Sequence, residues 1–425
     1  MGEHLVSRQV LASVPRTRTV TMTIVSAEFF TMLLLIVTAV GFDFTNGFHD
    51  TGNAMATSIA TGALKPKTAV ALSGVLNLVG AFLSVEVAIT VTTSVLKIQN
   101  DTGGLVTGLT SEKAMFIIFA GLIGGILWNL LTWLLGLPSS SSHALFGGLM
   151  GAGLAAIGSS GINWDGLVVK VIIPAVLSPF IAGLISTVGT SLVFRLTRHA
   201  RADRKESGFR VGQIATASLV SLAHGTGDAQ KTMGVVALAL IAHGTLTDAS
   251  IEANGLPVWI IAMCAGSIAL GTYIGGWRVI RTLGKGLVEI DPPQGLAAEA
   301  ASAVVILTSS SLGMALSTTH VATGSIMGSG LGRPGAQVRW GVAGRMAVGW
   351  LITIPMAAIG GAVTYWIGHA IGGAAGATVI FAMLLALAGL IYYRAQQQKV
   401  GAENVNADWD ESSNSVVPAA VPAAA

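Results

Sequence analysis

Charged side chains are scarce in this chain. Asp, Glu, Lys and Arg make up 10% of its 425 residues, whereas a soluble domain of ordinary composition carries about 25%. Hydrophobic residues make up 52%, and they form long apolar runs that short polar loops separate. This composition excludes an ordinary soluble domain and predicts an all-α polytopic membrane protein.

Cysteine is almost absent, because Cys264 is the only one and it lies in an apolar run. A disulfide framework and a cysteine metal site are therefore excluded. Segments of about ten residues with alternating hydrophobicity are also lacking, which excludes a transmembrane β-barrel. Glycine is plentiful, with 54 residues, and small residues permit close helix packing in lipid. We expect the lipid bilayer, and no nucleic acid, as a partner.

The apolar runs predict about 11 or 12 transmembrane crossings. They cover residues 22–63, 68–96, 113–135, 138–157, 166–195, 211–243, 256–277, 297–312, 313–330, 340–368 and 373–393. The Gly-rich runs 138–157 and 313–330 start with Ser/Thr residues, so they either span the membrane or form the arms of re-entrant hairpins. The side of the N-terminal segment, residues 1–28, stays open. Residues 394–425 are polar and then rich in Ala and Pro, which predicts a disordered tail.

Two pairs of motifs indicate an internal duplication. Aligning NGFHDTGNA with AHGTGDAQK puts Asp50 on Asp228, 178 positions later. GLPSSSSH, ending at His143, matches GMALSTTH, ending at His320, 177 positions later. Two independent matches at nearly one spacing predict two structural repeats, residues 29–196 and 211–368, followed by an extra helix at 373–393.

The distribution of basic residues gives the orientation. The linker 197–210 is rich in Arg and Lys, which assigns it to the cytoplasm. The short loop around Lys65 and Lys67 is basic, whereas its counterpart in the second half is not; the loop carrying Arg278 and Arg281 shows the opposite pattern. Basic loops that change sides between the halves predict inverted-topology repeats with helices broken near the membrane midplane, and a cytoplasmic C-terminus.

Each half places a carboxylate at membrane depth. Burying an Asp at the centre of a membrane helix costs about 2.5–3.5 kcal/mol on insertion scales, so Asp50 and Asp228 indicate a functional site. Inverted repeats bring equivalent elements together, and hydroxyls and amides at helix starts bind oxyanions. We therefore expect an anion site lined by Asp50, Asn53, Ser141, Ser142, Thr226, Asp228, Lys231, Thr232, Thr318 and Thr319.

Ionised carboxylates repel an anion, so the two Asp side chains must be protonated or bridge through a cation. This predicts coupling of anion movement to H⁺, Na⁺ or a divalent metal at Asp50 and Asp228, with no other cofactor. We expect a supporting role, without direct ligand contact, for His49, His143, His224 and His320. Three structural alternatives stay open: the two Asp residues as helix N-caps, Lys231 as the partner of a structural ion pair, and the basic linker as a topology signal only.

At these residues the chain resembles the inorganic phosphate transporter family, the Pit or PHO4-type permeases. The family's duplicated motif of the Gly-Ala-Asn-Asp-x-Ala-Asn-Ala kind matches 47–54 and 225–232, and its hairpin elements match the segments that end in His143 and His320. The resemblance covers residues 29–368. It implies phosphate uptake at the plasma membrane, with phosphate and the coupling cation bound between the repeats; a homodimer is an open alternative.

The departures from the family motif concern the coupling ion. His49 and Gly227 replace the Asn before each Asp, and Lys231 replaces the later Asn of the second motif. Because a lysine cannot supply an oxygen ligand, a Na⁺ site would be weakened. The chain is therefore similar to the bacterial low-affinity Pit subgroup, which implies H⁺-coupled uptake of phosphate or of a metal–phosphate complex. Na⁺ coupling is the alternative.

Two further functions fit parts of the sequence. The residues from Gly225 to Asp228 match the GxGD pattern of intramembrane aspartyl proteases, with Asp50 as the partner. The protease hypothesis does not explain the duplicated Ser/Thr-His segments, and the Pro-Ala-Leu motif of that enzyme class does not occur in the chain. A transporter of another oxyanion, such as sulfate or arsenate, fits the same residues as the phosphate hypothesis.

Overall fold

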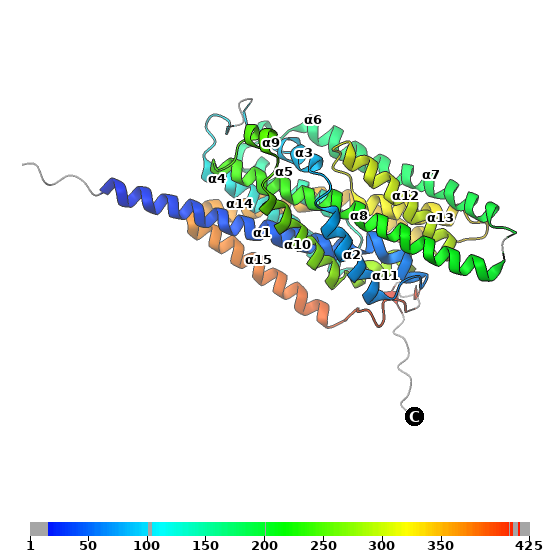
Figure 1. Cartoon of the computed structure of the whole chain (residues 1–425). Helices are drawn as coiled ribbons and strands as arrows, with labels where there is room; N and C mark the ends of the chain where they lie inside the picture. Colours follow the sequence, from blue (N-terminus) through cyan, green and yellow to red (C-terminus); the bar gives the residue numbers. More distant parts are fainter. Residues whose placement is uncertain (1–15, 101–103, 200, 408, 411–414, 417–425) are drawn as a thin grey trace, which may run out of the picture.

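The computed structural model describes residues 16–100, 104–199, 201–407, 409–410 and 415–416, and in this part of the chain nearly all regular structure is helical. The long helices run along one common direction in an elongated bundle (Figure 1). The expected fold class, an all-α polytopic membrane protein, is confirmed in these terms.

The helices of the first half are α1 (Arg16–Ala60), α2 (Pro66–Gly80), α3 (Glu86–Ser94), α4 (Ser111–Leu134), α5 (Ser141–Ile157), α6 (Trp164–Leu167) and α7 (Ile173–Leu196). Those of the second half and the tail are α8 (Ala202–His243), α9 (Asp248–Asn254), α10 (Val258–Ile274), α11 (Trp277–Arg281), α12 (Pro292–Ser311), α13 (Thr318–Leu331), α14 (Trp340–Ile371) and α15 (Gly373–Gln396). Short 3₁₀ or π turns lie at Ser159–Gly161, Val168–Ile172 and Thr282–Gly286, and two short strands, β1 (Trp409–Asp410) and β2 (Ser415–Val416), pair antiparallel.

Five described helical segments are long and apolar enough to cross a membrane, or six if the pair α9 and α10, bent by 88°, counts as one span. They are Ala27–Ala60, Ser111–Leu134, Trp164–Leu196, Trp340–Ile371 and Gly373–Gln396. Helices α5 and α13 have 17 and 14 residues, fewer than the roughly 20 that a span needs, so they fit the re-entrant alternative. The expected 11 or 12 crossings stay a prediction.

The prediction of helix breaks at the two Asp motifs is wrong. Helix α1 runs without interruption through Asp50, and α8 runs through Asp228. The glycines of these motifs serve close packing, since a Cβ at Gly47 would meet the backbone of α10 and one at Gly225 would meet the backbone of α2. Both Asp residues lie well inside their helices, so the N-cap alternative is also excluded.

The two halves pack across each other in a matched way. Helix α5 of the first half lies on α14 of the second, and α13 of the second half lies on α7 of the first. Gly151 contacts the backbone at Ala358, while Gly328, at the corresponding position, contacts the backbone at Gly183. These crossed contacts agree with a duplication; the inverted topology stays a prediction from the charge pattern.

The prediction of a disordered tail from residue 394 is wrong for residues 394–407. Helix α15 ends at Gln396, and the chain that follows lies against the bundle. Val405 is 1% exposed, the Arg281 guanidinium donates to the carbonyl of Asn404 at 2.8 Å, and Asn406 donates to the carbonyl of Ile59 at 3.0 Å. The sequence interpretation missed these backbone contacts because the segment is mostly polar. Residues 1–15 and most of 408–425 lie outside the described residues.

Candidate functional site

Two carboxylates that are distant in sequence meet inside the bundle. One ligand atom each from Asp50, His224 and Asp228 lies within 4.8 Å of the others. Asp50 is 2% exposed and Asp228 is fully buried. Helices α1 and α8 bring these residues together, as the duplication predicted.

Each carboxylate accepts a hydrogen bond from the start of a short helix. Ser141 Oγ donates to Asp50 Oδ2 at 2.8 Å, and Thr318 Oγ1 donates to Asp228 Oδ2 at 3.0 Å. The caps of α5 and α13 also correspond, because Ser140 and Ser317 accept from the backbone N–H three residues later. The partial positive ends of both helices therefore lie beside the carboxylates, where they favour negative charge.

Asn53 and Lys231, which occupy corresponding motif positions, reach across to the other half. Asn53 Nδ2 donates to Thr318 Oγ1 at 3.3 Å and to Thr319 Oγ1 at 3.0 Å. Lys231 Nζ donates to Ser142 Oγ at 2.6 Å and to the carbonyl of Leu316 at 2.9 Å, and it forms an ion pair with Asp228. The ammonium is thus surrounded by three oxygen atoms in a buried position.

Two of the expected supporting histidines contact the carboxylates directly. His49 Nδ1 lies 2.6 Å from Asp50 Oδ1, and its Nε2 lies 3.2 Å from Thr132 Oγ1 and 3.3 Å from Ser139 Oγ. His224 Nε2 lies 3.0 Å from Asp228 Oδ2. Each carboxylate therefore has its own imidazole, from the preceding residue in α1 and from the preceding turn in α8.

The other two histidines, His143 and His320, directly follow the hydroxyl residues in sequence. The rings of His143 and His320 pack edge to face with centroids 4.8 Å apart, and His320 Nδ1 lies 2.9 Å from the carbonyl of Ala175. Ser140 and Ser317 form the helix caps, so the imidazoles have no part in the capping. The two rings instead join the helix starts of the two halves.

Two predicted ligand residues point elsewhere. Thr226 Oγ1 donates to the carbonyls of Gly80 and Leu222 and lines a cavity of about 550 Å³ together with Glu86 and Ser310. Thr232 Oγ1 donates to Asp43 Oδ1 at 3.0 Å. Neither hydroxyl belongs to the cluster around Asp50 and Asp228.

The sequence interpretation missed one buried acid, Glu299. The residue is 3% exposed, and its carboxylate accepts from Thr57 at 2.5 Å, Ser58 at 2.6 Å and Thr216 at 2.7 Å. It therefore ties α12 to α1 and α8. The signal was a lone Glu in the apolar segment 297–312.

Comparison with known proteins identifies the family of the chain. The model of the phosphate transporter family matches residues 46–361. The chain is 58% identical over 383 residues to a probable low-affinity inorganic phosphate transporter of Mycobacterium bovis, covering 90% of this chain and 88% of that protein. It is 41% identical over 335 residues to a protein of the same description from Bacillus subtilis, covering 79% and 96%.

A solved structure shares the fold. A sodium-dependent phosphate transporter aligns with a TM-score of 0.67 at 23% identity, over 79% of this chain and 98% of that one. The expected family resemblance is confirmed by the match over 46–361 and by the close relatives. The chain is a multi-pass membrane protein and belongs to the phosphate transporter family.

Proposed function

We propose that this chain imports inorganic phosphate across the plasma membrane by symport with H⁺. The relatives' description as probable low-affinity inorganic phosphate transporters supports the substrate. The environment of Lys231 supports H⁺ as the coupling ion, because its ammonium has Asp228, Ser142 and the carbonyl of Leu316 as oxygen partners.

Phosphate recognition rests on donors at two helix starts. The hydroxyls of Ser141, Ser142, Thr318 and Thr319 and the first-turn amides of α5 and α13 suit an oxyanion. Lys231 adds positive charge. These hydroxyls bond to Asp50, Asp228, Asn53 and Lys231 in the present arrangement, so phosphate entry requires them to exchange partners.

Protonation makes that exchange favourable. Asp50 and Asp228 are buried, and two ionised carboxylates beside a phosphate anion in a medium of low dielectric repel it strongly. A proton on either acid removes one negative charge and frees the hydroxyl bonded to it. His49, with Thr132 and Ser139 beyond it, forms a hydrogen-bonded chain that can carry a proton to Asp50.

The same geometry argues against Na⁺ in the second half of the site. Hard cations such as Na⁺ need several oxygen ligands. Lys231 Nζ already uses three oxygens there and cannot donate an electron pair while protonated. The ammonium of Lys231 therefore occupies the position that a Na⁺ ion would need. The likeness to a sodium-dependent transporter at 23% identity concerns the fold alone.

A metal–phosphate complex is a second candidate substrate. Two carboxylates and an imidazole within 4.8 Å of one another form a donor set that suits a divalent cation. A cation bound to phosphate would arrive as cargo and offset the charge of the phosphate, so that the substrate could approach the two acids without a proton on either. Dependence of uptake on Mg²⁺ at constant pH distinguishes this candidate.

Alternating access between the two repeats would deliver the substrate. The residues around Asp50 and Asp228 are buried, so in this arrangement they are exposed to neither side of the membrane. The crossed packing of α5 on α14 and of α13 on α7 supports a mechanism in which one repeat moves against the other. Inverted topology and a homodimer belong to this proposal.

Protease chemistry is not supported. The relatives are described as transporters. The deciding experiment is uptake of radiolabelled phosphate into proteoliposomes, with the pH, Na⁺ and Mg²⁺ gradients varied one at a time. Uptake driven by Na⁺ at constant pH, without response to a pH gradient, would refute the proposal; competition by arsenate and sulfate measures selectivity.

A further inference from the structure

Another buried acid lies on the same stripe of α1 as Asp50. Asp43 precedes Asp50 by seven residues, nearly two helical turns, so both side chains leave α1 in about the same direction. Asn46 and Asn53 continue this stripe, three and ten residues after Asp43. Asp43 is fully buried and lies near the middle of the spanning segment Ala27–Ala60. A carboxylate at this depth indicates a functional role.

The carboxyl group of Asp43 has few hydrogen-bond partners. Thr232 Oγ1 of α8 donates to its Oδ1 at 3.0 Å, whereas its Oδ2 is buried and has no partner among the described residues. By contrast, the carboxylate of Glu299 accepts from three hydroxyls and one amide. A buried carboxylate that is ionised needs such donors or a cation. Asp43 therefore lacks the surroundings that stabilise a negative charge.

In the described part of the chain, Asp43 has no ion pair. The titratable groups that face it are Asp228 and Lys231 of α8 and Cys264 of α10. Asp228 repels a negative charge on Asp43, and the ammonium of Lys231 contacts three other oxygens instead. Helices α4 and α15 also pack on α1, and their charged residues lie at the helix ends: Glu112, Lys113 and Arg394. These neighbours favour an uncharged Asp43, which is an acid that holds a proton.

One proton would give partners to two buried oxygens that lack them. The side chain of Asn46 lies beside Asp43, one turn further along α1, and its Oδ1 also has no hydrogen-bond partner among the described residues. A protonated carboxyl group has one O–H donor. A proton on Asp43 Oδ2 supplies that donor to Asn46. Because buried polar atoms without partners are costly, both side chains favour the protonated acid.

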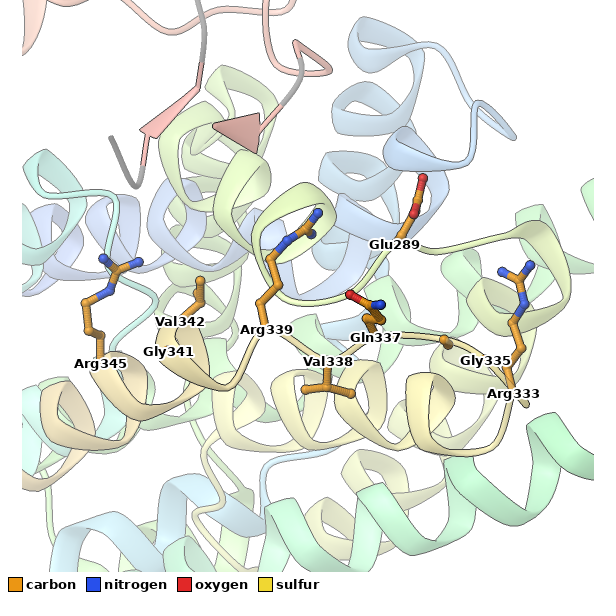
Figure 2. Close-up of a pocket in the computed structure, with 10 residues that line it drawn as sticks. Glu289, Arg333, Gly335, Gln337, Val338, Arg339, Gly341, Val342 and Arg345 are labelled. Atoms are coloured by element: carbon orange, nitrogen blue, oxygen red, sulfur yellow. The ribbon is translucent and has the colours of Figure 1, made fainter. Parts of the chain in front are cut away.

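Basic residues mark the cytoplasmic end of the bundle. Figure 2 shows Arg333, Arg339 and Arg345 just before and at the start of α14. The guanidinium of Arg333 is 6.0 Å from the ring centroid of Phe194, near the end of α7 and directly before the linker 197–210. Arginines that gather beside membrane spans assign this end to the cytoplasm.

Asp43 lies on the outer side of the transport site. Arg210, near the start of α8, donates to the carbonyl of Ala63, just after α1, at 3.3 Å, so α1 ends where α8 begins. Asp43 precedes Asp50 in α1, and Thr232 lies four residues beyond the acid of α8. The contact between Asp43 and Thr232 is therefore about 10 Å further from the cytoplasm than Asp50 along α1. Further out, residues 29–42 of α1 and 233–242 of α8 include no charged side chain.

We propose that Asp43 is a further proton-binding residue of the transporter, which loads protons from the outer side. The proton comes from water on that side, binds to Oδ2 of Asp43 and moves on along the polar stripe of α1 to the carboxylate of Asp50. Asp43 is then ionised until the next proton arrives. This inference rests on the proposed function, H⁺ symport, and adds one residue to it.

Transport by the full chain in proteoliposomes tests the role of Asp43. Asp43→Asn keeps the shape of the protonated acid and an acceptor for Thr232, but it cannot release a proton. It should lose phosphate uptake driven by a pH gradient and keep exchange of labelled for unlabelled phosphate, because exchange needs no net proton movement. Asp43→Glu should recover part of the pH-driven uptake. The matched control is Thr38→Val, which removes a buried hydroxyl of α1 that donates to the carbonyl of Leu34; it should take up phosphate as the wild type does.

Infrared spectroscopy of the purified full chain tests the proton itself. At neutral pH the wild type should show the carbonyl stretch of a protonated carboxylic acid that Asp43→Asn lacks, and both should unfold at the same temperature in detergent. Equal spectra in this region would overturn the inference, whichever ion drives uptake.

The transport assay separates this inference from the proposed function. If the wild type responds to a pH gradient and Asp43→Asn responds equally, the role of Asp43 is refuted and H⁺ symport stands. Loss of exchange together with uptake in a stable Asp43→Asn would also refute the role, because the residue would then serve phosphate binding. A wild type that does not respond to a pH gradient refutes the proposed function itself, and the loading role of Asp43 with it.

Discussion

Lys231 Nζ lies 2.6 Å from Ser142 Oγ, so a lysine of the second half contacts the hydroxyl helix of the first. The corresponding residue of the first half, Asn53, contacts Thr319 of the second at 3.0 Å. The two contacts are related by the duplication but differ in charge. This difference gives the site a fixed positive group on one side only, beside Asp228.

Replacement of Lys231 should change the coupling ion. Lys231→Asn restores an oxygen ligand at the position that Asn53 occupies in the first half, so uptake should become dependent on Na⁺ and respond less to a pH gradient. The measurement is phosphate uptake in proteoliposomes with each gradient imposed alone. Lys231→Met is the matched control, since it removes the charge without supplying a ligand; it should lose uptake under both gradients. Wild-type uptake in Lys231→Met would contradict the role of the lysine.

Neutralising Asp228 should abolish pH-dependent uptake and also destabilise the protein. Asp228→Asn leaves the buried ammonium of Lys231 without its counter-charge, and breaking a buried ion pair costs about 3–5 kcal/mol. Uptake and thermal unfolding in detergent measure the two effects. The double variant Asp228→Asn with Lys231→Met should recover much of the stability without uptake. A single variant that still takes up phosphate in response to pH would rule out Asp228 as the proton carrier.

The crossed helix packing should depend on glycine. A Cβ at Gly151 or at Gly328 would collide with backbone atoms of α14 or α7, so Gly151→Ala and Gly328→Ala should each destabilise the fold by about 1–3 kcal/mol, as overpacking does. The control is Gly344→Ala in α14, where a Cβ meets no atom within 4 Å. Thermal unfolding in detergent gives the comparison. Equal stability of all three variants would show that these close approaches relax without cost.

Glu299 should act as a structural acceptor between helices. Glu299→Ala leaves the buried hydroxyls of Thr57, Ser58 and Thr216 without their acceptor, and each such loss costs about 1–3 kcal/mol. Glu299→Gln retains an acceptor oxygen and should lose less stability while keeping phosphate uptake. Uptake assays and thermal unfolding separate the two effects. Loss of uptake in Glu299→Gln at wild-type stability would instead assign the acid a part in transport.

Much of the site could be predicted from the sequence because the duplication is visible in it. The pairing of Asp50 with Asp228, and of Ser141 with Thr318, follows from two motif matches at nearly one spacing. Thr226 and Thr232 share the motif but turn to Gly80 and Asp43. Adjacent positions on a helix face different directions, so motif membership alone did not fix which hydroxyls reach the cluster.

The fold was predictable to the level of the apolar segments and their order along the chain. Helix continuity was not, because the glycines of the Asp motifs fit both a break and a close contact, and only the neighbouring backbones of α10 and α2 decide between them. The ordered residues 397–407 were missed for a similar reason. Their side chains are mostly polar, and their contacts run through backbone carbonyls to Arg278 and Arg281.

By itself the sequence determined the membrane class, the duplication and the two acids at the centre of the site, Asp50 and Asp228, because hydrophobicity and repeated motifs are properties of the order of residues. The tertiary structure decided which groups surround each acid. Asp50 contacts His49 and Ser141, whereas Asp228 contacts His224, Thr318 and Lys231. The contacts of Ser141 and Thr318 join segments far apart in the chain. Which of the nearby side chains turn toward each acid depends on helix rotation and on distances of a few ångströms that the order of residues does not show.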